Sequence, residues 1–172
     1  MTEPTVQQLW TAPAAGEPMS GRTSAEAVAG VGLAGDRYAE GTGHYSPYDV
    51  CQVTFVGAAA LDCVREAFDL DLDDGRHRRN VVVDGDVLDL LETRFRVGGA
   101  VFEGTRRRPP CAHLRDVTGE DDIVAALGED RGGICADVVE GGTVAVDDAV
   151  TVVERLDDPD SLAAALRERH EE

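Results

Sequence analysis

The feature of this sequence that most limits its fold is a succession of short, valine-rich segments separated by closely spaced turn signals. Period-two alternation and the abundance of β-branched residues predict strands in these segments. The predicted strands lie at residues 5–10, 50–56, 79–83, 95–106 (two strands around Gly98-Gly99) and 134–156 (three strands with turns at Gly141-Gly142 and Asp147-Asp148). Helical spacing is confined to residues 57–68, 119–127 and 159–172, with a turn or short helix at 86–91. Many short strands and few helices predict a mainly β fold, a closed or nearly closed β-barrel with a few short helices.

The length and the lack of internal repeats predict one domain, residues 1–156, followed by a helical tail at 157–172. The chain has 34 acidic residues against 16 basic ones, a formal net charge of -18, and every one of those basic residues is arginine. Such a negative surface repels nucleic acid and anionic membranes, so neither is expected as a partner. Without lysine, the chain has no residue that could form an internal aldimine with pyridoxal phosphate. The acidic, lysine-free composition resembles that of proteins from salt-accumulating haloarchaea, and we expect low salt to loosen the fold.

The apolar pattern and the cysteines indicate a protein of the cytoplasm. The chain has no run of about 18 apolar residues, so no membrane span is predicted. The N-terminus MTEPTVQQLW lacks the features of a signal peptide. Cys51, Cys63 and Cys135 have apolar neighbours and are predicted to be buried as small hydrophobic side chains. No cysteine lies in a CxxC pair, so the spacing gives no support for a zinc site.

Two arginine-rich islands interrupt the acidic background, each at the end of a predicted strand: residues 76–80 (RHRRN) and 106–115 (RRRPPCAHLR). Individually, these arginines could simply neutralise neighbouring carboxylates. Together they indicate a shared anion pocket, because ligand sites form at the mouths of barrels and guanidinium groups bind phosphate in a bidentate way. Alternation along residues 100–108 predicts that Arg106 and Arg108 share the inward face with Phe102.

Cys111 lies directly beyond the second run of arginines, after Pro109 and Pro110, which restrict the backbone before it. Nearby positive charge predicts a lowered thiol pKa and therefore a thiolate, the form that is nucleophilic and binds soft transition metals. With His113 two residues further on, the segment indicates either a site for an anionic, metal-bearing ligand or a Cys–His nucleophilic hydrolase or transferase. The alternative without function is an inert buried cysteine beside a salt-bridged loop.

Six segments occur in a familiar order and spacing: GLAGDRYAEGTGHYS (32–46), QVTFV (52–56), RRNVVVDGDVLDLL (78–91), FRVGGAVFEG (95–104), PPCAHL (109–114) and RGGICADVVEGGTVAVDDAV (131–150). Together they resemble the MOSC domain, the C-terminal domain of molybdenum cofactor sulfurases, which also occurs as a standalone prokaryotic protein. The resemblance spans residues 25–153 and implies a β-barrel that binds the molybdenum cofactor, molybdopterin. It further implies that Cys111 ligates molybdenum or carries sulfur bound for it.

The resemblance also implies roles for individual residues. It adds Arg79, Asn80, Arg131 and Gly132 as cofactor-binding candidates to Arg106 and Arg108, which the charge pattern indicates. Cys111 and His113 are the catalytic candidates, with Cys111 as the metal ligand and His113 orienting the ligand or tuning the thiolate.

The same resemblance ranks the possible functions. The chain lacks the pyridoxal-phosphate desulfurase module of full sulfurases, so sulfur would come from a separate donor protein. Its segment GTGHYSPYD has His44 alone where N-hydroxy-reducing members carry histidine-rich, lysine-containing stretches, which favours cofactor carriage or sulfur handling. The leading hypothesis is a molybdenum cofactor binding protein that delivers sulfur or performs small redox chemistry through Cys111, as a sulfurtransferase or an oxidoreductase. The alternatives are a non-catalytic interaction module of a sulfur or cofactor pathway and the Cys–His hydrolase. The sequence is also compatible with a homodimer.

Overall fold

The computed structural model describes residues 3–14, 16–37, 39, 51–108, 112–128 and 131–156, with the backbone alone for Ala112 and His113. The elements in chain order are β1 (Val6–Thr11), β2 (Ser20–Arg22), β3 (Ser24–Val28), β4 (Gly32–Leu33), β5 (Val53–Gly57), α1 (Ala58–Phe68), β6 (Val81–Val83), the 3-10 helix η2 (Val87–Leu90), β7 (Thr93–Val97), β8 (Ala100–Arg107), α2 (Ala112–Thr118), α3 (Ile123–Ala126), β9 (Ile134–Glu140), β10 (Gly142–Ala145) and β11 (Val150–Arg155). The predicted helical tail at 157–172 lies outside the described residues.

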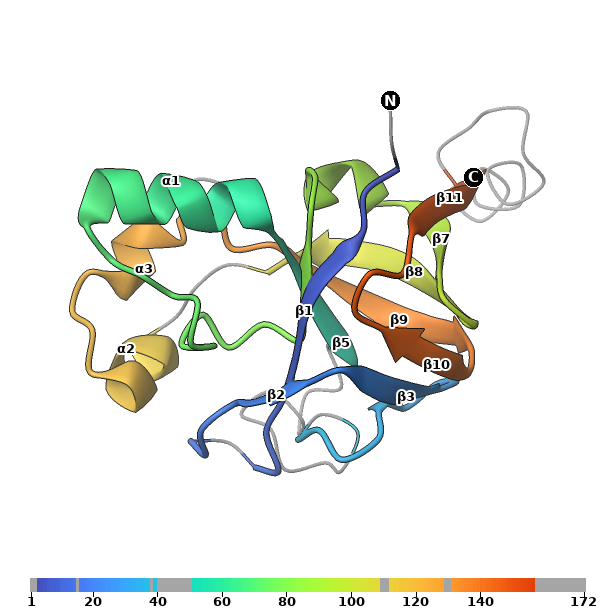
Figure 1. Ribbon diagram of the computed structural model, residues 1–172, viewed down its shortest axis with the longest axis horizontal. Coiled ribbons are helices and arrows are strands. Elements are labelled where there is room, and N and C mark those ends of the chain that lie inside the picture. Colours follow the sequence, from blue (N-terminus) through green and yellow to red (C-terminus); the bar gives the residue numbers. More distant parts are fainter. Residues whose placement is uncertain are drawn as a thin grey trace, which may run out of the picture.

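The strands form one large curled sheet and one small sheet (Figure 1). The large sheet has eight strands in the order β11-β7-β8-β9-β5-β6-β1-β2, and the small sheet has the order β10-β3-β4. All the paired strands are antiparallel except β5 and β6, which α1 joins by a crossover. A bridge between Thr5 and Ala149 connects the start of β1 to the residue before β11, so the curl of the large sheet brings its two ends together. The mainly β, barrel-like fold that the sequence predicts is confirmed.

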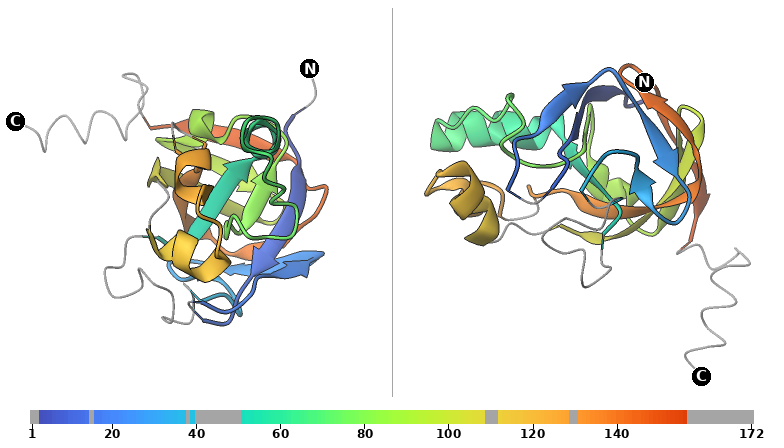
Figure 2. Two further views of the ribbon diagram at one scale, coloured as in Figure 1. Left: turned by 90° about the vertical axis from the view of Figure 1, so that its left-hand side faces the viewer. Right: turned by 90° about the horizontal axis from the view of Figure 1, so that it is seen from below.

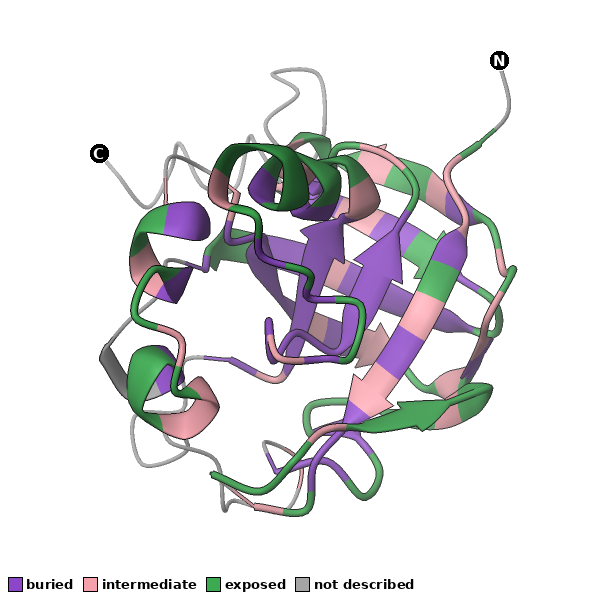
Figure 3. Cartoon of the chain, turned by 60° about the vertical axis from the view of Figure 1, so that its left-hand side comes forward, coloured by how far each residue is buried: buried purple, intermediate pink, exposed green. Residues whose placement is uncertain are grey.

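Strand β5 is buried on both faces, which explains its unbroken apolar run VTFVG (Figure 3). Inside the curl, the Phe55 ring lies 5.2 Å from each of the Phe95 and Phe102 rings, measured between centroids. On the outer face, Val56 packs in a second cluster with Leu61 of α1 and with side chains of α2 and α3. The three helices therefore lie together outside the sheet, on one side of it (Figure 2).

The predicted elements that have the strongest sequence signals are confirmed. The strands around Gly98-Gly99 are β7 and β8, the segment 134–156 forms β9, β10 and β11, and the predicted helix at 57–68 is α1. The short elements β2, β3, β4 and α2 were not predicted from the sequence. Within the described part of the chain, no helix is long and apolar enough to cross a membrane.

Candidate functional site

The two arginine-rich islands, far apart in sequence, meet in the fold at the side chain of Arg79. Its Nε donates to the carbonyl oxygen of Gly132 at 2.7 Å, and its Nη2 donates to that of Arg108 at 3.4 Å. The backbone of Arg108 is fixed in turn, because its N–H donates to the carbonyl of Gly133 at 2.8 Å. A Cβ on Gly132 would lie 2.3 Å from the Arg108 carbonyl oxygen, so only glycine allows this close approach. Three of the predicted site residues thus lie side by side.

Four arginines are buried around this point, with exposed fractions between 3% and 8%: Arg37, Arg78, Arg79 and Arg108. Among the described residues, the buried carboxylate is that of Asp36, which pairs with Arg37 at 3.0 Å between Oδ1 and Nη1. Arg37 Nη2 also donates to the carbonyl of Arg78 at 3.0 Å, which joins the pair to the first island. Burial of a charge is costly unless an opposite charge or hydrogen bonds compensate it. Among the described residues, this end of the barrel therefore gathers four buried guanidinium groups and one buried carboxylate.

Sequence reasoning did not assign Arg37 as a site residue. A signal was present, because Asp36 and Arg37 belong to the GDRY motif within the first segment that resembles the MOSC domain. Asp36 is held in place from both sides: its Oδ1 accepts from the backbone N–H of Ala12 at 3.1 Å as well as from Arg37. The motif thus supplies a fixed guanidinium group and its counter-ion.

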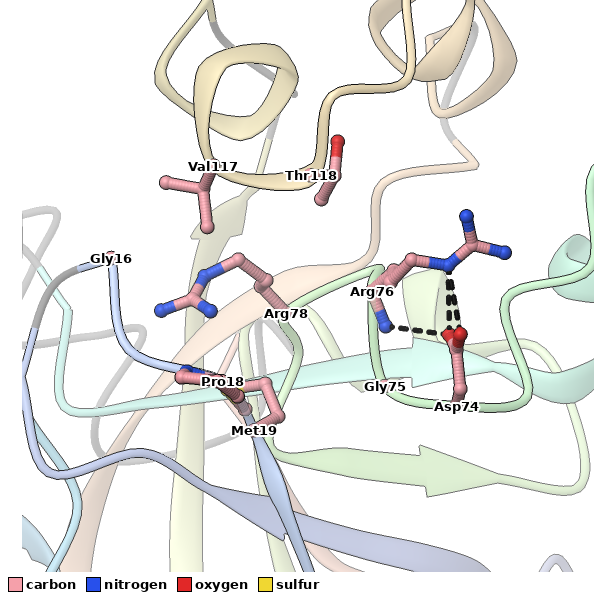
Figure 4. Close-up of a pocket in the computed structure, with 9 residues that line it drawn as sticks. All are labelled: Gly16, Pro18, Met19, Asp74, Gly75, Arg76, Arg78, Val117 and Thr118. Carbon is pink, nitrogen blue, oxygen red and sulfur yellow. Dashed lines mark hydrogen bonds and ion pairs between the residues drawn. The ribbon is translucent and has the colours of Figure 1, made fainter.

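Arg78 adopts a left-handed backbone conformation, with φ of 60°, which is uncommon for a residue other than glycine. As a result, Arg78 and Arg79 reach different neighbours, and Arg78 lines a cleft of about 200 Å³ (Figure 4). The cleft is lined by Gly16, Pro18, Met19, Asp74, Gly75, Arg76, Arg78, Val117 and Thr118. Arg76 pairs with Asp74 at 2.9 Å and with Glu120, whereas Arg78 Nη1 donates to the carbonyl of Glu17 at 2.6 Å. The wall opposite these arginines comes from the last residues of α2, the helix that follows the PPC segment.

Several predicted cofactor-binding residues have local structural contacts. Asn80 is fully buried: its side chain accepts from the N–H and hydroxyl of Thr54 and donates to the carbonyl of Trp10. Arg131 donates to the carbonyls of Ala125 and Ala126 at the end of α3. Cofactor contact by Asn80 and Arg131 stays a prediction.

The alternation predicted along β8 is interrupted. The pairing of β8 with β9 has a register shift between Gly104 and Arg106, and Arg106 is exposed while Arg108 is buried. A bulge of this kind re-aims the side chains that follow it. Of the two arginines predicted to face inward, Arg108 is therefore the one that joins the buried cluster.

Cys111, Pro109 and Pro110 lie outside the described residues, and only the backbone of His113 is described. The backbone of His113 is helical and lies in α2, whereas we predicted a strand-like segment from the sequence. The expectation that Cys111 and His113 point the same way rested on strand geometry, which the helical backbone at His113 does not share, and the relative placement of the two side chains stays a prediction.

The remaining cysteines differ from one another. Cys51 and Cys135 are buried as predicted, but Cys63 is exposed on α1, so the prediction is wrong for that residue. Cys51 and Cys135 are also in contact, with 2.7 Å between their Sγ atoms. Among the described residues, no three histidine, cysteine or acidic side chains gather in a way that could hold a metal ion.

The comparisons with known proteins agree with this fold. The family described as "MOSC domain" matches residues 41–151, more than half of the chain, and the chain belongs to this family. A comparison with curated protein sequences found no match.

Three crystal structures show the same fold. The YuaD protein from Bacillus subtilis is 17% identical with a TM-score of 0.72, over 88% of this chain and 96% of that one. YiiM from Escherichia coli is 20% identical with a TM-score of 0.65, over 92% and 73% of the two chains. YiiM from Geobacillus stearothermophilus is 13% identical with a TM-score of 0.67, over 97% and 84%.

Proposed function

We propose that this protein binds a molybdopterin-type cofactor at the arginine-rich end of its barrel, with the Cys111 thiolate as the sulfur ligand of the metal. The observation that carries the proposal is the gathering of four buried guanidinium groups, those of Arg37, Arg78, Arg79 and Arg108, at one end of the barrel. A buried site of that charge favours an anionic ligand, and the terminal phosphate of molybdopterin is one. Membership of the MOSC domain family supports the same ligand.

The residues present fit such a group. Arg78 lines the cleft and would donate N–H groups to phosphate oxygens in the bidentate geometry that guanidinium favours. Arg79 holds the carbonyls of Gly132 and Arg108, and so fixes the point at which the chain leaves β8 toward Cys111. When bound, the cofactor would supply a thiophilic, redox-active metal that can accept sulfur. The chain supplies charge, orientation and a thiolate.

The proposed role is to handle sulfur for the cofactor or to use the cofactor in small redox chemistry, as a sulfurtransferase or an oxidoreductase. Because this chain has no lysine, it has no residue for the pyridoxal phosphate of a cysteine desulfurase. Sulfur would then come from a partner protein that carries it as a persulfide. The proposed sulfur transfer therefore requires two proteins, this chain and the partner that carries the persulfide.

The test replaces the arginine that lines the cleft and compares it with an arginine elsewhere. Arg78→Gln removes the charge from the cleft, and Arg94→Gln is the matched control, because Arg94 is half-exposed on β7 and pairs with Glu103 at 3.3 Å. A hydrogen bond to a charged group contributes about 1.5–3 kcal/mol, so we expect cofactor affinity to fall about ten- to hundredfold. The readout is the pterin that copurifies in high salt from a molybdenum-replete host. Equal pterin in the wild type, Arg78→Gln and Arg94→Gln would contradict the proposal.

A further inference from the structure

Two cysteines to which the proposed cofactor chemistry assigns no role lie in direct contact. Cys51 immediately precedes β5, and Cys135 lies in the neighbouring strand β9, opposite Thr54 in the register. The Cys51 thiol donates to Cys135 Sγ across a distance of 2.7 Å. Two thiols that are 84 residues apart in the sequence are thus held only about 0.7 Å further apart than in a disulfide bond.

The surroundings of the pair shift the pKa values of the two thiols in opposite directions. The hydrogen bond from Cys51, together with the positive charges of Arg108, Arg106 and Arg79, lowers the pKa of Cys135, although burial opposes this shift. The same hydrogen bond raises the pKa of Cys51, and burial raises it further. Of the two thiols, Cys135 is therefore the one whose ionised form is favoured. One thiolate beside one thiol is the arrangement from which disulfides form.

The spacing argues against a metal site at this pair. Two thiolates that share a tetrahedral zinc ion lie about 3.8 Å apart, because each Zn–S bond is about 2.3 Å long. The observed separation of 2.7 Å is too short to admit the ion between them. In addition, the described residues provide no third histidine, cysteine or carboxylate at this place. The separation of the two sulfurs is closer to that of a sulfur–sulfur bond than to that of two zinc ligands.

We propose that Cys51 and Cys135 form a reversible redox pair that a peroxide converts into a disulfide and a dithiol reductant restores. The Cys135 thiolate attacks hydrogen peroxide, so that an S–O bond forms, the O–O bond breaks and hydroxide leaves. The Cys51 thiol then attacks the oxidised sulfur, and its own proton leaves with the hydroxyl group as water. The two sulfurs lose two electrons in all, and the peroxide is reduced. Cys51 retains 8% of its surface exposed and Cys135 is fully buried, so peroxide would have to reach Cys135 past Cys51.

The product would change the molecule in two ways. The disulfide would tie β5 to β9 across a loop of 84 residues, which constrains the unfolded chain. It would also remove the negative charge of the Cys135 thiolate from beside Arg108 and Arg106.

The experiment uses the full chain in high salt, treated with hydrogen peroxide, digested with trypsin and analysed by mass spectrometry. Cleavage at Arg37 and Arg65 leaves Cys51 and Cys63 in one peptide. The mapping is therefore done in the Cys63→Ser variant, because Cys63 is exposed on α1 whereas the two cysteines of the pair are buried. We expect peptide 38–65 to be linked to the peptide that contains Cys135, the link to disappear with dithiothreitol, and the melting temperature to rise by about 10 °C on oxidation. The Cys51→Ser variant should show no linked peptide and no such rise.

Two results would overturn the proposal. One is peroxide consuming Cys63 or Cys111 in the wild type while Cys51 and Cys135 remain free thiols. The other is oxidation of Cys135 to a sulfinic acid without any link to Cys51. Both are read from the wild-type and Cys63→Ser proteins, so they hold even if Cys51→Ser does not fold.

Discussion

Acidification is predicted to destabilise this protein through His77, a fully buried residue in the loop before β6. Its Nδ1 accepts a hydrogen bond from the backbone N–H of Arg79 at 2.9 Å, so the ring proton lies on Nε2, which has no hydrogen-bond partner among the described residues. Burial, with added repulsion from the Arg79 guanidinium, lowers the pKa of His77 from 6.5 to about 3, although Asp74 opposes the shift. Protonation would put a charge in a site without solvent and break the hydrogen bond from Arg79.

The sign and size of the pH effect on stability follow from the difference between the pKa of His77 in the folded and in the unfolded chain. Because the pKa is lower in the folded state, the unfolded chain binds the proton first, and stability falls as the pH drops from about 6.5 toward about 3. One proton corresponds to about 1.4 kcal/mol per pH unit, or about 4 to 5 kcal/mol over the whole window. The loss is thus of the order of a small domain's entire stability.

The assay is urea unfolding in molar potassium chloride at pH 7, 6, 5 and 4, for the wild type and for His77→Asn. Asparagine can place an acceptor oxygen near the position of Nδ1 and does not titrate, so this variant keeps the hydrogen bond from Arg79 without the pH dependence. The wild type should lose up to about 1.4 kcal/mol per pH unit more than His77→Asn below pH 6. Parallel pH profiles for the two proteins would refute the reasoning.

Three further predictions concern packing and charge. Gly132→Ala should lower the free energy of unfolding in urea by about 1–3 kcal/mol, because its Cβ would lie 2.3 Å from the Arg108 carbonyl oxygen. The control Gly128→Ala, whose Cβ would have its nearest contact at 3.4 Å, should lose less stability. Equal losses in the two variants would contradict this prediction. Asp36→Asn should cost about 3–5 kcal/mol by leaving the buried Arg37 without its counter-ion, and an unchanged denaturation midpoint would be inconsistent with that pair. With a net charge of -18, the melting temperature should fall as potassium chloride is lowered from molar to millimolar concentration, and a constant value would argue against charge repulsion.

The sheet could be predicted largely from the sequence, because its strands carry local signals. The turn at Gly98-Gly99 separates two alternating runs, and these are β7 and β8. Strand β2 carries no such signal, since all three of its residues, Ser20–Arg22, are exposed and none is apolar. Helix α2 was missed because Pro109 and Pro110 indicate a break, and the helix begins only at Ala112.

The composition of the site was harder to predict than its location. The two arginine islands were predicted to share one pocket, and the contact between Arg79 and Arg108 joins them in the fold, while their role in binding stays a prediction. The burial of Arg37 depends on its pairing with Asp36 inside the fold, and a charged residue in a glycine-rich segment indicates a surface position. The contact between Cys51 and Cys135 joins residues far apart in the chain, and no local pattern indicates it.

Metal and pterin content will decide whether this chain binds a molybdenum cofactor through Cys111. The wild type, Cys111→Ala and the matched control Cys63→Ala would be purified in high salt from a molybdenum-replete host. The account predicts molybdenum and pterin with the wild type and with Cys63→Ala, whose thiol is exposed on α1, and little molybdenum with Cys111→Ala. Molybdenum at the same level in all three proteins would contradict the role of Cys111, and its absence from all three would contradict cofactor binding itself.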